Sequence, residues 1–122
     1  MSYFVGFLLA VPTAKKAAYK DMAEKTWEIF EELGCLGNYE NWGVDVPDGK
    51  VTSFPMAVKK KDDETVVFSW MEWPDKETAD KGFAAMMEDP RMKEMTDMPF
   101  DGQRMIWGGF EPLTHKTAKA KV

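Results

Sequence analysis

Residues 3–11 read Tyr3-Phe-Val-Gly-Phe-Leu-Leu-Ala-Val11, and this stretch decides the fold. It is aromatic and aliphatic throughout and ends at Pro12, which is typical of a β-strand. Alternate residues of a strand point to opposite faces of its sheet, and here both alternating sets are apolar. Both faces of this strand must therefore be covered, one of them by helices of the same chain.

A helix is predicted directly after this strand. Thr13 offers an N-cap, apolar residues recur at helical spacing from Tyr19 to Leu33, and Gly34 stands where such a helix would end. Near the C-terminus, Pro74-Asp75 and Asp89-Pro90 are typical of helix starts. The first predicts a helix from Asp75 to about residue 88, and the second predicts a short helix from Pro90 to about residue 95.

Four further stretches are predicted to be strands, and they are Cys35–Val44, Phe54–Lys60, Thr65–Trp73 and Gln103–Glu111. The polar loop Lys61-Asp-Asp-Glu64 separates the middle two, so we expect them to form a β-hairpin. The stretch Thr65–Trp73 again carries largely apolar residues on both of its faces.

This order of elements reduces to βαββαβ, which predicts an α+β class protein with the ferredoxin-like fold, an antiparallel sheet with helices on one face. Exposed Phe, Leu and Trp side chains on the other face would cost about 1.5–3 kcal/mol each relative to burial. Two-fold dimers are the commonest oligomers, so we expect a homodimer that joins two sheets face to face, a dimeric α+β barrel. The alternative is a monomer whose exposed aromatic face binds a ligand. We expect one domain over residues 1–113 and a polar, flexible tail over 114–122.

The composition excludes several partners. The net charge is −5 and the pI is about 4.9, and an acidic surface repels nucleic acid. Basic residues gather in the tail, at Lys116, Lys119 and Lys121, which we interpret as a solvated end. The apolar N-terminus has no basic leader region and is too short to span a bilayer, so no membrane partner is expected. Cys35 is the single cysteine, which fits a reducing compartment, and we expect a cytoplasmic protein.

Five segments of the chain carry a family resemblance, and they are Tyr3–Pro12, Trp42–Lys50, Lys61–Trp70, Asp89–Met95 and Met98–Pro112. They resemble the bacterial DUF1428 family, which includes the YbaA-like proteins, and the resemblance extends over about residues 2–113. The resemblance implies a dimeric α+β-barrel domain, in agreement with the pattern of strands and helices. It implies no activity, because the family is named for having none assigned.

Most catalytic chemistries lack their residues in this chain. The single His and the single Cys lie far apart, and the acids of the turns lack the spacing of a calcium loop, so no metal is expected. Cys35 follows a helix C-terminus, which disfavours a thiolate, and we interpret it as a buried structural thiol. There is no glycine-rich phosphate loop, and no cofactor is expected. Acid–base chemistry by Glu40, Glu72, Asp101 or Glu111 stays open, with Arg104 as a partner for one of them.

Aromatic residues on the predicted strands are the most informative candidates for a site. A pocket between sheet and helices that is lined by rings and a few polar groups suits a flat apolar ligand. The candidate pocket residues are Tyr39, Asn41, Trp42, Trp70, Arg104 and Trp107. The alternative is that these rings form a packed core and a dimer seam.

Two functions follow from these residues. The first is a small dimeric domain that binds a small apolar or aromatic metabolite between sheet and helices. The alternative is a cofactor-independent monooxygenase or isomerase of the dimeric α+β-barrel type, for which Asn38, Asn41, Trp42 and Arg104 would be the residues of interest. Whether the chain is an enzyme stays open, since this alternative rests on analogy of fold alone.

Overall fold

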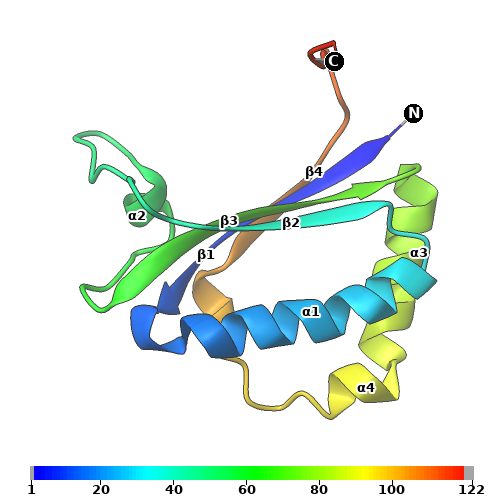
Figure 1. Cartoon of the computed structure of the whole chain (residues 1–122), viewed down its shortest axis with the longest axis horizontal. Coiled ribbons are helices and arrows are strands. Elements are labelled where there is room, and N and C mark those ends of the chain that lie inside the picture. The colour runs from blue at the N-terminus through cyan, green and yellow to red at the C-terminus, as the bar shows by residue number, and fades with distance from the viewer. Residues whose placement is uncertain (1, 120–122) are drawn as a thin grey trace.

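The computed structural model describes residues 2–119, and within them a four-stranded antiparallel sheet runs in the order β2-β3-β1-β4 (Figure 1). The strands are β1 (Tyr3–Pro12), β2 (Gly37–Trp42), β3 (Glu64–Trp73) and β4 (Ile106–Phe110). The helices are α1 (Lys16–Glu32), α2 (Phe54–Ala57), α3 (Lys76–Glu88) and α4 (Pro90–Lys93), with 3₁₀ turns at Thr13–Lys15 and Gly102–Arg104. This is the predicted ferredoxin-like βαββαβ arrangement.

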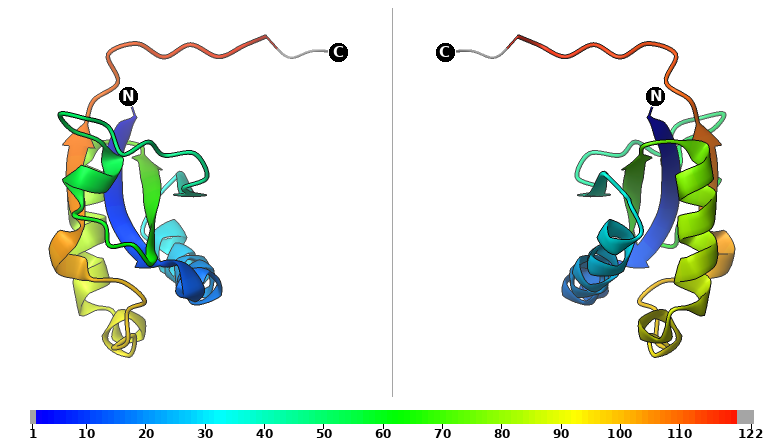
Figure 2. Two further views of the ribbon diagram at one scale, coloured as in Figure 1. Left: turned by 90° about the vertical axis from the view of Figure 1, so that its left-hand side faces the viewer. Right: turned by 90° about the vertical axis from the view of Figure 1, so that its right-hand side faces the viewer.

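The helices α1, α3 and α4 all lie on one side of the sheet (Figures 1 and 2). From β1, Val5, Leu9 and Val11 point to this helix side and are buried there. Cross-strand partners share a face, so Val67, Met71 and Trp73 of β3 join the same core. The opposite set, represented by Phe4 and Leu8, lies on the face that no helix of α1, α3 or α4 covers. We call this second face the open face.

The first helix begins later than the sequence predicted. Thr13 does not cap it, because its hydroxyl pairs with the hydroxyl of Thr65 at 2.7 Å, and residues 13–15 form a 3₁₀ turn instead. The predicted end is confirmed, since Gly34 follows the helix with a φ of +101°, a conformation that favours glycine. The caps of the later helices are confirmed too, because Asp75 accepts from the Thr78 amide and Asp89 from the Arg91 amide.

The predicted hairpin is wrong. Residues 54–57 form helix α2, because the Ser53 hydroxyl accepts from the Met56 amide and Pro55 occupies the first turn. Pro55 also lacks the amide that a strand needs for pairing. Strand β3 pairs with β1 and β2 instead.

Two other strands are shorter than predicted. The stretch 35–44 contributes only Gly37–Trp42 to the sheet. The stretch 103–111 contributes Ile106–Phe110, because the Asp101 carboxylate caps a 3₁₀ turn at its start. Residues 111–119 have no helix or strand and run away from the sheet on its open side (Figure 2). The rest of the predicted tail, with Lys121, lies outside the described residues.

Gly82 permits α3 to approach the sheet, and Gly82→Ala is expected to destabilise the protein by about 1–3 kcal/mol. A methyl group there would stand 2.6 Å from the Trp73 ring, which is fully buried and cannot yield. Elsewhere in a helix the same change stabilises by about 0.5–1 kcal/mol, so the sign of the effect is diagnostic. Urea unfolding measures it. Gly102→Ala, which meets no atom within 4 Å, is the control, and equal effects of the two changes would contradict this packing.

Candidate functional site

A small pocket of about 190 Å³, partly open to solvent, lies between the helix side of the sheet and the helices. Its wall is rich in methionine and phenylalanine, contributed by α1, α3, α4, the sheet and the segment that returns to β4. The methionines are Met22, Met71, Met86, Met92, Met98 and Met105. Methionine side chains adapt to the shape of a ligand, so this wall suits an apolar guest. We call this space the inner cavity.

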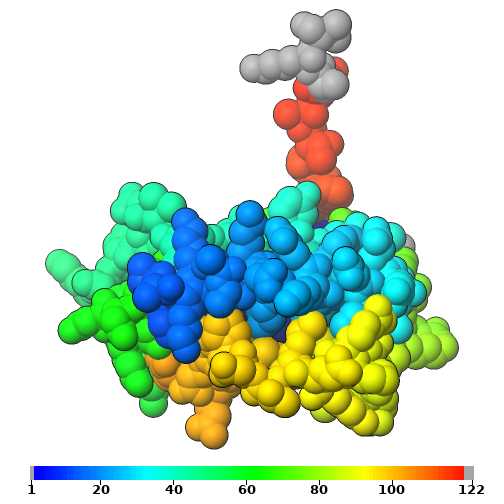
Figure 3. All heavy atoms as spheres, turned by 60° about the horizontal axis from the view of Figure 1, so that its bottom comes forward, coloured from blue at the N-terminus to red at the C-terminus, as the bar shows by residue number. Residues whose placement is uncertain are grey.

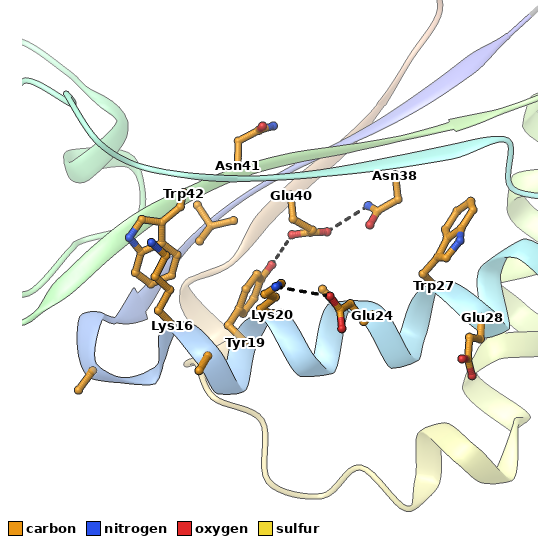
Figure 4. Close-up of a pocket in the computed structure, with 14 residues that line it drawn as sticks. Lys16, Tyr19, Lys20, Glu24, Trp27, Glu28, Asn38, Glu40, Asn41 and Trp42 are labelled. Carbon is orange, nitrogen blue, oxygen red and sulfur yellow. Dashed lines mark hydrogen bonds and ion pairs between the residues drawn. The ribbon is translucent and has the colours of Figure 1, made fainter.

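A larger groove of about 940 Å³ opens to solvent between α1 and the edge strand β2. Trp42 and Trp27 stand toward its two ends (Figure 4), and small alanines of α1 form its floor, among them Ala17 and Ala23. The Lys16 ammonium lies 5.4 Å from the centre of the Trp42 ring, a cation–π contact at one end of the groove. We call this space the outer groove.

Three polar side chains line both spaces, and they are Tyr19, Asn38 and Glu40. The Tyr19 hydroxyl donates to one oxygen of Glu40 at 2.6 Å, and the Asn38 amide donates to the other at 3.0 Å (Figure 4). Burial of Tyr19 and the neighbouring Glu40 carboxylate raise the pKa of its phenol, which therefore stays protonated as a donor. The trio forms the wall between the inner cavity and the outer groove.

Strand geometry explains why two of these residues meet α1. Asn38, Glu40 and Trp42 alternate along β2 and so share its helix side, opposite Met71, Ser69 and Val67 of β3. Tyr19 reaches them from the first turns of α1. Figure 3 shows α1 in blue and cyan beside the segment that includes α4 in yellow, and together they cover this side of the molecule.

The structure does not bring the six predicted pocket residues together. Trp42 lines the outer groove, and Asn41 borders the groove at the edge of β2 with its side chain directed to the open face (Figure 4), while Trp107 lines a separate groove of about 640 Å³ between β4 and α3. Tyr39 and Trp70 lie on the open face, where their rings stack with centroids 5.1 Å apart. A role of these residues in ligand binding stays a prediction.

Arg104 lies apart from both spaces. Its guanidinium binds the buried Glu64 carboxylate through two hydrogen bonds of 2.6 and 2.7 Å, and it also donates to Asp101 and to the Lys59 carbonyl. This network ties the start of β4 to the start of β3. Its bond to Asp101 is one of the pairings that the sequence offered for Arg104, whereas Glu64 was not among the candidate partners. The network leaves few donors for a ligand.

Tyr19 is the residue that sequence reasoning missed, because it falls within the apolar stripe of its helix and was assigned to the core. Glu40 and Asn38 were among the candidates for chemistry. Cys35 is a buried thiol as predicted, with its Sγ 3.3 Å from the carbonyl oxygens of both Gly37 and Glu72, and burial raises the pKa of the thiol. Among residues 2–119 no three acids, histidines or cysteines gather as a metal site would require, and no helix there is long and apolar enough to cross a membrane.

Comparison with known proteins gives a family and a fold. A family model described as "Protein of unknown function (DUF1428)" matches residues 2–102. The uncharacterized protein YbaA of Escherichia coli K12 is 56% identical over 114 residues, which is 93% of this chain and 97% of that protein.

Solved structures with the same fold are distant in sequence. A monooxygenase from the gene ActVA-Orf6 of Streptomyces coelicolor, in complex with nanaomycin D, has a TM-score of 0.61 at 16% identity, over 97% of this chain and 93% of that one. SnoaB, a cofactor-independent oxygenase from Streptomyces nogalater, has a TM-score of 0.56 at 14% identity, over 93% of this chain and 94% of that one. A dimeric ferredoxin-like protein from an uncultured marine organism has a TM-score of 0.53 at 13% identity, over 97% of this chain and 100% of that one.

Proposed function

We propose that this chain, which belongs to the DUF1428 family of proteins of unknown function, is a homodimer that binds a small, flat, apolar or aromatic molecule between its sheet and its helices. The observation that carries the proposal is the pair of apolar spaces that share one polar wall. Ligand sites are concave, mostly apolar and carry a few convergent polar groups, which is the composition of these spaces. The outer groove has the volume of a small-molecule site, and the inner cavity extends it.

The ligand site predicts a strong effect of filling the outer groove. Ala23 lines the groove on α1, so the ring of Ala23→Phe would occupy the space that the ligand needs. We expect affinity for naphthalene-type ligands such as 2-naphthol to fall by more than about 10-fold, a loss of roughly 1.4 kcal/mol or more. Quenching of tryptophan fluorescence measures binding, because Trp27 and Trp42 line the groove.

The matched control is Ala18→Phe, which makes the same change on the same helix at an exposed residue outside the groove. It should leave the affinity unchanged. Equal affinities for the Ala23 and Ala18 variants would place the ligand elsewhere, and no binding of any aromatic ligand by the parent protein would end the proposal.

The homodimer forms through the open face. Phe68, Tyr39, Ile106 and Phe110 are each about half exposed there, at 46%, 58%, 46% and 61%. Large side chains bury about 150–250 Å² when fully covered, so half-exposed residues of this kind, together with Phe4, Leu8 and Trp70, offer several hundred Å² per subunit. That approaches the roughly 800 Å² per partner of a standard interface. A second copy has the same apolar face and the matching shape that two-fold symmetry supplies.

A cofactor-independent monooxygenase or isomerase is the second candidate. Glu40 is a carboxylate that the outer groove exposes, and it holds a buried phenol at the edge of an apolar cavity. Such a pair can accept a proton from a bound substrate. Two structural neighbours are oxygenases, although identities of 16% and 14% make this an analogy of fold. Oxygen uptake with 1,4-dihydroxynaphthalene that requires Glu40 would identify an oxygenase.

The working unit is the domain over residues 1–113, with 114–122 as its polar tail. We place the protein in the cytoplasm, since its single thiol is buried and unpaired and fits a reducing compartment.

A further inference from the structure

We infer, on the basis of the ligand site proposed above, that Tyr19 and Glu40 act as a selective gate between the outer groove and the inner cavity, which opens for aromatic ligands that carry a hydrogen-bond donor. The favoured ligand has a hydroxyl or N–H group on a flat apolar ring system. Its donor takes the place of the Tyr19 hydroxyl on Glu40, and its ring system extends from the outer groove into the methionine-lined inner cavity.

The position of the trio supports a gate. Tyr19 is only 7% exposed, whereas Glu40 on the facing strand is exposed to the outer groove. Because Tyr19, Asn38 and Glu40 line both spaces, a rotation of the Tyr19 side chain away from β2 would join the inner cavity to the groove. The Tyr19 ring meets Phe100 edge-on with centroids 6.0 Å apart. Phe100 lies on a segment without helix or strand, and the methionines nearby adapt readily, so neighbours of Tyr19 can yield.

The hydrogen bonds decide which ligands open the gate. A carboxylate oxygen accepts hydrogen bonds, and Asn38 and Tyr19 each donate to a different oxygen of Glu40. A ligand hydroxyl can replace the Tyr19 hydroxyl one for one, so the acceptor is never left without a partner. An ether has no hydrogen to offer and leaves Tyr19 in place. A ligand carboxylate would bring a second negative charge to Glu40 and would be repelled.

The rest of the inner cavity orients the ligand. Its polar side chains, among them Ser69 and Asn38, gather near β2 and β3, and Ser69 lies directly across from Glu40 in the sheet. The opposite wall is formed by residues such as Phe83 and Met86 of α3. A ligand would therefore point its donor at β2 and its ring at α3.

If the hydrogen bond between Tyr19 and Glu40 only holds α1 against β2, the expected effect of Tyr19→Phe on ligand affinity is the opposite of the one that the gate predicts. Under the gate, Tyr19→Phe frees Glu40 from its internal donor, so the ligand no longer competes with it, and affinity for a phenolic ligand rises. Under a structural role, the same change loosens the site, and affinity falls.

The experiment titrates three naphthalenes of one ring size, 2-naphthol, 2-methoxynaphthalene and 2-naphthoate, into the full chain and follows tryptophan fluorescence. We expect the parent protein to bind 2-naphthol at least about 10-fold more tightly than the other two, as a hydrogen bond to a charged group allows. Tyr19→Phe should raise the affinity for 2-naphthol several-fold. Glu40→Gln should reduce the preference for 2-naphthol over the ether to less than about 3-fold. Glu31→Gln, the same charge change at an exposed site on α1, should leave the preference for 2-naphthol unchanged.

The outcomes separate the gate from the site. Equal binding of the three naphthalenes, or weaker binding of 2-naphthol by Tyr19→Phe, would overturn the gate and leave the ligand site standing. Binding of none of them would overturn the site itself. If Tyr19→Phe fails to fold, the test of the gate is the preference of Glu40→Gln for 2-naphthol over the ether. A preference equal to that of the parent protein refutes the role of Glu40.

Discussion

Replacing Phe68 by glutamate is expected to turn the proposed homodimer into a folded monomer. Phe68 lies near the centre of the open face, across from Leu8 of β1 and Asn41 of β2. Its ring contacts Trp70 and Phe54, with centroids 5.3 and 5.7 Å away. In a two-fold interface the same patch meets itself, so one substitution brings two carboxylates into an apolar seam. An unpaired carboxylate loses several kcal/mol on burial, which should weaken the dimer by more than about 100-fold.

Sedimentation at micromolar concentrations measures the change, and circular dichroism verifies that the variant is folded. Phe68 is already half exposed in the single subunit, so its replacement should spare the core. Met87→Glu is the control, because Met87 is exposed on α3 at the helix side of the sheet. A parent protein that is monomeric, or a Phe68→Glu variant that remains dimeric, would refute the open-face dimer.

The fold was predictable because its signals are local and agree with one another. Gly34, Asp75 and Asp89 each mark a helix boundary through backbone chemistry that needs no tertiary context. The two-faced apolar pattern predicted that both faces of β1 and β3 are covered, and the structure places these two strands in the middle of the sheet. The strand predicted at residues 54–60 was wrong because the apolar residues there favour a strand, whereas the Ser53 cap and Pro55 together favour a helix.

The site was only partly predictable, for a geometric reason. Both faces of β1 are apolar, so the sequence could not say which of them meets the helices. The six candidates were grouped by residue type, although Tyr39 and Asn41 alternate with Trp42 along β2 and therefore point to the other face. Tyr19 looked like a core residue, and only its distance to Glu40 reveals its polar role.

The ion pair between Arg104 and Glu64 is expected to give the stability of the protein a marked dependence on pH at the acid end. The Arg104 guanidinium and the Lys61 amide hold the pKa of Glu64 at about 2, against an ordinary value of 4.5. A carboxylate whose pKa is lowered by folding stabilises the folded state at every pH above its pKa in the unfolded chain. This stabilisation is lost as pH falls through its pKa in the folded protein. The contribution of Glu64 should therefore be complete above about pH 4.5 and disappear toward pH 2.

Arg104→Met is expected to remove this contribution, about 2–3 kcal/mol near neutral pH once solvent screening is allowed for. The Glu64 side chain is only 4% exposed, so without Arg104 it remains as a buried charge with little more than the Lys61 amide to satisfy it. Urea unfolding from pH 7 to pH 2 measures the difference between parent and variant, which should shrink below pH 4.5 as Glu64 becomes protonated in both.

Arg91→Met is the matched control, because Arg91 also bridges two acids, Glu32 and Asp89. Its side chain is 46% exposed and that of Glu32 is 61% exposed, while Asp89, at 18%, keeps the hydrogen bond from the Arg91 amide, so the effect should be small. The contrast follows from burial of the carboxylate, since both arginines make bidentate pairs. Equal losses in the two variants, or a loss for Arg104→Met that does not change with pH, would show that the Arg104 network acts through packing of its aliphatic stem and not through the charge of Glu64.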